Sequence, residues 1–295
     1  MKKTSLVMVF VILISLLTGC MTDSASGKLK DVVKIDENKY SCTFDGVKHD
    51  FLLYLPSEYK NAPLVMLLHG YAESAELFRS KTSFHETAAP RGYAAVYVDG
   101  SSNKAGGAGA NGWNSGISSE GNDDVAFLRD LAVCLQEKFS LNKDRTYAVG
   151  FSNGAFMTHR LAMEAQDTFS GCVSVAGKMP KAVWEKRNES NNVSFFQVTG
   201  EKDNVVPKHS DRSADSAIDP AIEDVVDYWV TSDGLSFADE SETGKGSKLT
   251  KYQAEGKRSK VWNLSVKDGY HSWPDDRINA FVINDLILDF FDAVN

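Results

Sequence analysis

The chain has 295 residues, of which 42% are hydrophobic and 24% are charged, as expected of a globular protein with a full apolar core. Its formal net charge is −8, and no lysine- or arginine-rich run occurs, so composition argues against a nucleic-acid partner. Length alone allows one or two domains. No linker-like stretch divides the chain after its N-terminal segment, so we expect a single globular domain over residues 38–295.

The N-terminal segment predicts export followed by lipid anchoring. Two lysines precede an apolar run over 5–17, which is too short to span a membrane. The run closes with Leu17-Thr18-Gly19-Cys20, an ending that resembles the lipobox of bacterial lipoproteins, where the cysteine is lipidated. We therefore expect a signal peptide over 1–19, a lipidated tether over 20–37, membrane attachment at Cys20 and a location in the bacterial cell envelope. An ordinary cleaved signal peptide is the alternative.

Strands and helices alternate along the rest of the chain. Strands are predicted over 39–44 and 49–55, around a turn at Asp45-Gly46, and over the apolar runs 64–68 and 93–98. A helix is expected over 80–89, a glycine-rich loop over 101–116, and a helix begins at the cap Asn122-Asp123. Further strands are expected over 145–149, 172–175, 194–198 and 261–266, and further helices over 155–165, 222–230 and 279–294. This alternation predicts an α/β fold with a mainly parallel sheet and right-handed crossovers.

Three cysteines remain in the predicted mature chain: Cys42, Cys134 and Cys172. In an oxidising compartment they can form at most one disulfide. The last two fall on a predicted helix and a predicted strand, where a buried thiol is common. The sequence leaves the pairing open.

The most informative motif is Gly150-Phe-Ser-Asn-Gly154, a G-x-S-x-G sequence between a predicted strand and a predicted helix. In this context the serine occupies a strained turn that exposes its hydroxyl at the sheet edge. The two glycines keep Cβ atoms out of the crowded turn. The motif predicts that Ser152 is a nucleophile.

A serine nucleophile needs a base and an acid that orients the base. His271 follows the last predicted strand, whereas the other histidine beyond the motif, His209, comes one strand too early. Asp203 follows the strand that ends near Thr199, with Glu201 as its nearest rival. Asp211 and Asp215 are weaker alternatives. The order serine, aspartate, histidine is the one found in α/β-hydrolases.

The oxyanion of an acyl-transfer intermediate needs two N–H donors. The backbone of Asn153, next to the nucleophile, is the first candidate, and that of Tyr71 in the loop after the strand 64–68 is the second. His69 is then expected to be a structural residue of that loop. No partner ligand at suitable spacing supports a metal role for it.

Together these segments resemble one esterase family. The resemblance rests on His69-Gly70, Gly112-Trp-Asn114, Asp123-Asp-Val125, Gly150-Phe-Ser-Asn-Gly154, Gly200-x-x-Asp203 and His271-Ser-Trp-Pro274, in order along the chain. The family comprises the polyhydroxybutyrate depolymerase-like esterases, with feruloyl esterases and related acetylxylan esterases. The resemblance implies the α/β-hydrolase fold and a triad of Ser152, Asp203 and His271. Asp275 and Ala155 stand where relatives often have glycine, and neither departure touches a catalytic atom.

The sequence and this resemblance together favour a serine esterase that needs no metal or cofactor. The expected substrates are feruloylated or acetylated oligosaccharides derived from xylan. Trp113 and Trp273 are candidates for stacking on an aromatic acyl group or a sugar ring, although each could equally pack within its own loop. A polyhydroxyalkanoate or short-chain ester hydrolase is the main alternative. A peptidase and a non-catalytic surface binding protein are weaker alternatives.

Overall fold

The computed structural model describes residues 27–102, 110–117, 121–208 and 220–294. The predicted signal peptide, Cys20 and the first part of the predicted tether, up to residue 26, therefore lie outside the described residues. Also outside them are the rival residues His209, Asp211 and Asp215.

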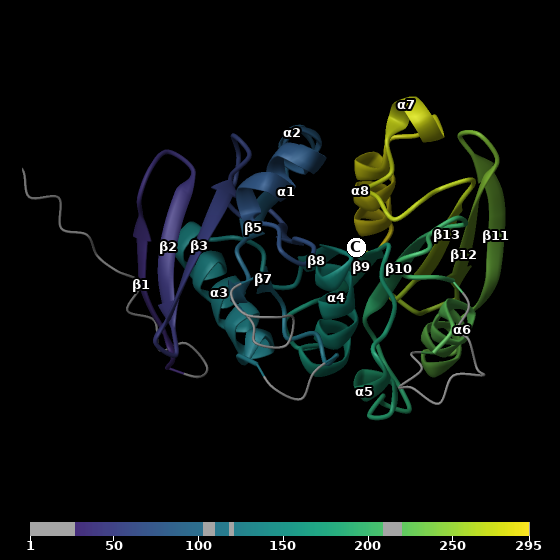
Figure 1. Cartoon of the computed structure of the whole chain (residues 1–295), viewed down its shortest axis with the longest axis horizontal. Helices are drawn as coiled ribbons and strands as arrows, with labels where there is room; N and C mark the ends of the chain where they lie inside the picture. Colours follow the sequence, from purple (N-terminus) through teal and green to yellow (C-terminus); the bar gives the residue numbers. More distant parts are fainter. Residues whose placement is uncertain (1–26, 103–109, 118–120, 209–219, 295) are drawn as a thin grey trace, which may run out of the picture.

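Within the described residues, one 11-stranded sheet runs through the molecule in the order β1-β2-β3-β5-β4-β8-β9-β10-β13-β12-β11 (Figure 1). The central strands from β5 to β13 are parallel, and antiparallel strands extend the sheet at both edges. The strands are β1 Leu29–Lys34, β2 Lys39–Phe44, β3 Val47–Tyr54, β4 Leu64–Leu68, β5 Ala94–Val98, β8 Thr146–Phe151, β9 Gly171–Val175, β10 Ser194–Gly200, β11 Ser236–Thr243, β12 Ser247–Gln253 and β13 Val261–Val266. A separate two-stranded ribbon pairs β6 Ser101–Ser102 with β7 Asn111–Gly112.

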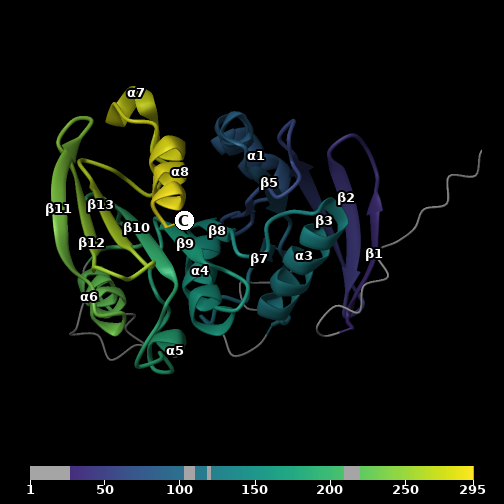
Figure 2. The same ribbon diagram turned by 180° about the vertical axis from the view of Figure 1, so that it is seen from behind.

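Helices cover both faces of this sheet (Figures 1 and 2). One face packs against α3, α4 and α6 and the other against α1, α2 and α8, so the core consists of two apolar layers on either side of the sheet. The strands β4, β5, β8, β9 and β10 are buried along their whole length, which explains their continuous apolar sequences. The helices are α1 Ala75–Thr82, α2 Phe84–Ala88, a 3₁₀ turn η1 Ala89–Arg91, α3 Asp124–Phe139, α4 Asn153–Glu164, α5 Lys181–Trp184, α6 Ile222–Ser232, α7 Asp276–Asn279 and α8 Ile283–Ala293.

The predicted α/β fold with a largely parallel sheet is confirmed, but four local features differ from the prediction. The predicted helix 80–89 is broken at Ser83, whose φ of 42° separates α1 from α2. Residues 29–34 were assigned to the tether, yet they form β1, because Leu29 and Val32 are buried and the strand pairs with β2. The hairpin β11–β12 was missed because its polar sequence gives no apolar pattern. The predicted helix 279–294 is interrupted at Ala280, whose φ of 57° ends α7 before α8 begins.

The sheet brings the candidate catalytic residues to one edge. Ser152 directly follows β8, Asp203 lies three residues after β10, and His271 lies in the loop after β13. These strands are parallel members of the same sheet, so their carboxyl ends meet at one edge. Binding sites of open α/β sheets lie at that edge.

Candidate active site

Ser152 occupies a strained turn between β8 and α4. Its backbone has φ 52° and ψ −114°, a conformation that costs a non-glycine residue about 1–3 kcal/mol. The flanking glycines make the turn possible. A Cβ at Gly150 would lie 2.1 Å from the carbonyl oxygen of Gly154, and one at Gly154 would lie 2.1 Å from that of Leu68. Larger residues at either position would push the helix away from the sheet.

The structure brings the three predicted catalytic side chains together. His271 Nε2 lies 2.9 Å from the Oγ of Ser152, and its Nδ1 lies 2.8 Å from the Oδ2 of Asp203. Because an ionised carboxylate can only accept, the Nδ1 proton is donated to Asp203, and Nε2 is then free to accept the serine proton. This arrangement is a continuous proton relay.

The carboxylate of Asp203 is held by its own loop. Its Oδ1 accepts the backbone N–H groups of Val205 and Val206, at 2.9 and 2.8 Å. Burial opposes ionisation, but the bonds from His271 and from this loop outweigh it, so the pKa of Asp203 lies below its ordinary value. The rival Glu201 instead pairs with Lys267 at 3.3 Å.

The loop after β4 leaves one backbone N–H available next to the elbow. Gly70 donates its N–H to Glu73, Ala72 donates to the carbonyl of Asn111, and Glu73 donates to Gly70. Among the described residues the N–H of Tyr71 has no such acceptor. Tyr71 is therefore the donor this loop can offer to a ligand.

Asn153 offers a second donor. It is the first residue of α4, where a backbone N–H has no partner inside the helix and the helix dipole favours negative charge. Its side chain is directed elsewhere, because Oδ1 accepts the N–H of Trp113 at 2.7 Å. Its Nδ2 donates to the carbonyl oxygen of Trp113 and to the hydroxyl of Ser115.

The two tryptophans proposed to stack on substrate are buried. Trp113 is 3% exposed and donates its indole N–H to the carbonyl of His69 at 2.9 Å. Trp273 is 8% exposed and packs edge-on against Phe78. Neither presents an open ring face, so the structure favours packing within the loops, the alternative that the sequence left open.

His69 is an internal support of this region. It is fully buried, and its Nε2 accepts the N–H of Gly100 at 2.9 Å, which places the ring proton on Nδ1. Nδ1 then donates to the carbonyl of Gly70 at 2.7 Å. Burial lowers the pKa of His69, so the ring is neutral. Both ring nitrogens are thus used in holding the loop.

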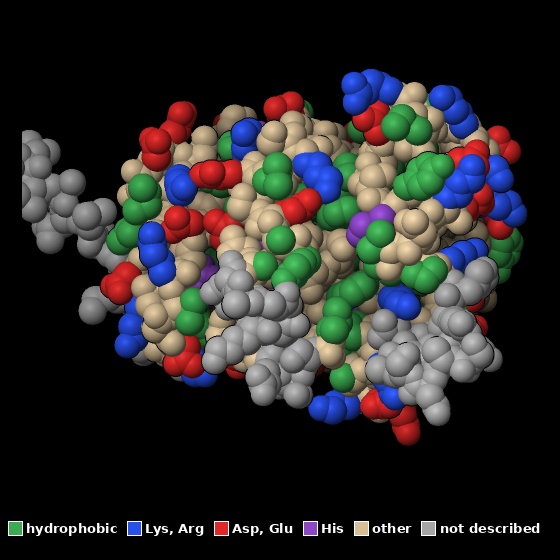
Figure 3. Space-filling model, in the orientation of Figure 1, with side chains coloured by type: hydrophobic (Ala, Val, Ile, Leu, Met, Phe, Trp, Pro, Cys, Tyr) green, Lys and Arg blue, Asp and Glu red, His purple; other side chains and the backbone are tan. Residues whose placement is uncertain are grey.

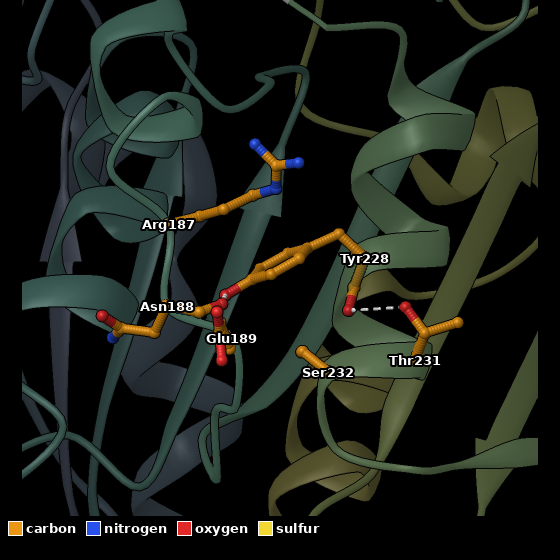
Figure 4. A pocket seen from close by; sticks show the side chains of 6 residues that line it. All are labelled: Arg187, Asn188, Glu189, Tyr228, Thr231 and Ser232. Atoms are coloured by element: carbon orange, nitrogen blue, oxygen red, sulfur yellow. Dashed lines mark hydrogen bonds between the residues drawn. The ribbon is translucent and has the colours of Figure 1, made fainter.

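Hydrophobic side chains and charged side chains are interspersed on the face drawn in Figure 3, where a histidine is visible near the middle. A separate pocket of about 450 Å³ lies between the segment after α5 and helix α6 (Figure 4). Arg187, Tyr228 and Thr231 are among its lining residues, and none of the three relay residues contributes to it.

In the described part of the chain, Cys42, Cys134 and Cys172 are buried thiols. No group of three His, Cys, Asp or Glu side chains among the described residues could hold a metal.

Comparison with known proteins identifies the family. The model of the Esterase family, described as "Putative esterase", matches residues 46–274. This chain belongs to the Esterase family. The matched region of this chain includes the turn of Ser152 and the loops of Asp203 and His271.

Two sequence relatives are themselves named esterases. The chain is 30% identical over 157 residues to "Putative esterase NocK" of Nocardia uniformis subsp. tsuyamanensis, which covers 52% of this chain and 43% of that protein. It is 27% identical over 149 residues to feruloyl esterase B of Piromyces equi, covering 50% of this chain and 27% of that protein. The chain thus spans less than half the length of these relatives.

A solved structure supports the fold. The acetyl xylan esterase from Aspergillus awamori superimposes with a TM-score of 0.62 over 83% of this chain and 94% of that chain, at 11% identity. At this identity the likeness shows a shared fold alone. This chain therefore shares its α/β architecture with that esterase.

Proposed function

We propose that this protein is a carboxylic ester hydrolase that acts through a Ser152–His271–Asp203 triad. The observation that carries the proposal is the continuous relay of 2.8 and 2.9 Å hydrogen bonds between the three side chains. A strained serine next to a bonded histidine is costly, and a surface binding protein has no use for it. Membership of the Esterase family supports the same conclusion.

In the proposed reaction, His271 Nε2 accepts the proton of Ser152 as its Oγ attacks the ester carbonyl carbon. The negative charge that develops on the carbonyl oxygen is stabilised by the N–H groups of Tyr71 and Asn153. His271 then donates its proton to the departing alcohol oxygen, which leaves an acyl group on Ser152. A water molecule then gives a proton to His271 Nε2 and attacks the acyl carbon. When the bond from that carbon to Ser152 Oγ breaks, His271 returns the proton to Oγ, which releases the acid and restores the serine. Asp203 stays ionised throughout and holds the imidazole in position.

For the substrate, we propose feruloyl or acetyl esters on xylan-derived oligosaccharides. The relative named feruloyl esterase B and the family resemblance of the motifs support this choice. A polyhydroxyalkanoate or another short-chain ester is the second candidate, supported by the relative named poly(3-hydroxyalkanoate) depolymerase C. A panel of methyl ferulate, acetylated xylan and a hydroxybutyrate oligomer separates the two. Cleavage of the hydroxybutyrate oligomer alone would overturn the proposal that the substrates are xylan-derived.

The nucleophile is tested with Ser152→Ala on p-nitrophenyl acetate. We expect kcat to fall by at least about 10³-fold, because removal of any triad member leaves only residual catalysis. Ser241→Ala, on the exposed edge strand β11, is the matched control and should retain full activity. Equal rates for Ser152→Ala and wild type would remove the proposed nucleophile.

We also propose that the protein is anchored in the cell envelope through a lipid on Cys20. This proposal rests on the N-terminal sequence alone. Among the described residues, no helix has both the length and the hydrophobicity that a membrane crossing requires. Two acyl chains on one cysteine suffice for stable anchoring. Cys20→Ser should move the protein from the membrane fraction to the soluble fraction. Unchanged membrane attachment would contradict the anchor.

A further inference from the structure

One short segment contacts both proposed oxyanion donors. This segment, residues 111–115, is called here the bridging segment. The carbonyl oxygen of Asn111 accepts the N–H of Ala72 at 2.8 Å. On the other side, Trp113 exchanges hydrogen bonds with the side chain of Asn153. A Cβ added at Gly112 would lie 3.1 Å from Asn153 Oδ1 and 3.3 Å from the ring of Tyr71. The bridging segment therefore holds Ala72, the neighbour of Tyr71, and the side chain of Asn153.

Two charged side chains clamp this segment at a single residue, Asn114. The Oδ2 of Asp124 accepts the N–H of Asn114 at 2.6 Å, and the Nη1 of Arg160 donates to its carbonyl oxygen, also at 2.6 Å. Asp124 is the first residue of α3 and Arg160 lies on α4. The clamp thus fixes the segment against two helices of the scaffold.

Nothing in helix α3 itself explains why Asp124 is buried. The side chain is fully buried, and its Oδ1 has no hydrogen-bond partner among the described residues. A buried carboxylate oxygen without a partner costs free energy. Helix α3 does not need Asp124 as its cap, because the neighbouring Asp123 already accepts the N–H of Ala126. The bond to Asn114 and the attraction of Arg160 offset this cost.

We propose that Asp124 is a positioning residue of the oxyanion hole. Through Asn114 it fixes the bridging segment, and through that segment it aligns the N–H groups of Tyr71 and Asn153 with the developing oxyanion. The inference rests on the proposed ester hydrolase activity. Because the oxyanion bonds matter most in the transition state, loss of this support lowers kcat and leaves KM nearly unchanged.

The test compares three variants with wild type on p-nitrophenyl acetate. Asp124→Ala should lower kcat by about 10- to 100-fold with KM within about threefold, because small displacements of oxyanion donors are costly. Asp124→Asn should stay within about threefold of wild type, since its amide oxygen still accepts the Asn114 N–H. Asp123→Ala removes the cap of the same helix, so it loses stability but should retain kcat.

The outcomes separate this inference from the proposed function. An inactive wild type, or an active Ser152→Ala, overturns the proposed function and this inference with it. An active wild type with a folded Asp124→Ala of unchanged kcat overturns this inference alone, as does an equal loss of kcat in Asp123→Ala. If Asp124→Ala does not fold, Arg160→Met decides, because it removes the other half of the clamp and keeps an unbranched side chain. A fall in kcat of about fivefold supports the inference, and an unchanged kcat contradicts it.

Discussion

At the scale of single residues, the site depends on which N–H groups remain available, because most polar groups around it already have hydrogen-bond partners. Of the four N–H groups from Gly70 to Glu73, two are used within the loop and that of Ala72 is accepted by Asn111, which leaves Tyr71 as the donor. The side chain of Asn153 is bonded to Trp113, so its backbone N–H is the group left to serve as the proposed donor. Pre-organisation of this kind avoids reorganisation during the reaction.

Asp124 also predicts a pH dependence of stability. Burial raises its pKa to about 6 in the folded protein, against roughly 3.9 for an unfolded aspartate. The folded state binds the extra proton between these values, so the free energy of unfolding falls as pH rises from about 4 to about 6 and the cost persists above pH 6. Asp124→Asn should therefore be more stable than wild type by about 3 kcal/mol at pH 8, because each pKa unit corresponds to about 1.4 kcal/mol.

Urea unfolding of both proteins between pH 4 and pH 8 measures this effect. The advantage of Asp124→Asn should shrink steadily below pH 6. A stability difference that does not change with pH would show that Asp124 titrates normally in the folded protein.

At the scale of elements, Trp113 packs within the bridging segment, which is one of the two roles that the sequence left open for it. Trp113→Phe removes the indole N–H that the carbonyl of His69 accepts, which should cost about 1–3 kcal/mol of stability. We expect kcat on aromatic esters to fall by roughly three- to tenfold, with KM unchanged within about twofold, because the change disturbs oxyanion donors. A large rise in KM at constant kcat would instead indicate stacking on the substrate.

Strand β1 gives an element-scale prediction about the domain boundary. Chains that begin at Gly27 and at Asn38 differ by this strand, in which Leu29 and Val32 are buried. Each buried side chain contributes about 1.5–3 kcal/mol, so the chain that begins at Asn38 should lose roughly 3 kcal/mol or more. Equal unfolding midpoints for the two chains would show that residues 29–34 do not stabilise the domain and belong to the tether.

The elements that the sequence predicted well are those with a clear physical signal. The apolar runs 64–68 and 93–98 correspond to β4 and β5 because both faces of these strands are covered. The capping pair predicted the start of α3, where Asp123 is the N-cap. By contrast, β11 is exposed along nearly its whole length and is held by its ladder with β12, which no local pattern reveals.

The candidate site shows the same limit. Motif and chain order pointed to Ser152, Asp203 and His271, and the structure joins them. The clamp on Asn114 was not foreseen. Asn114 and Asp124 stand in motifs of the family resemblance, but nothing in the sequence joined the two motifs to each other or to Arg160. Burial of Trp113 and Trp273 likewise depends on tertiary packing.

At the scale of the whole molecule, the parallel sheet performs the assembly. Ser152 and His271 are 119 residues apart in sequence, and Asp203 and His271 are 68 apart, yet their side chains are in hydrogen-bond contact. Each follows a strand of the parallel centre of the sheet, and the two helical layers hold those strands in register. The proposed chemistry is therefore a property of the complete fold.

The most direct test of this account is to identify the residue that becomes acylated. Wild-type protein would be mixed with p-nitrophenyl acetate, quenched in acid within the first turnover and analysed by peptide mass spectrometry. We predict one acetyl group on Ser152, none in Ser152→Ala and far less in His271→Ala. Rapid ester hydrolysis with no acetyl group on Ser152, or acetylation at another residue that persists in Ser152→Ala, would contradict the account.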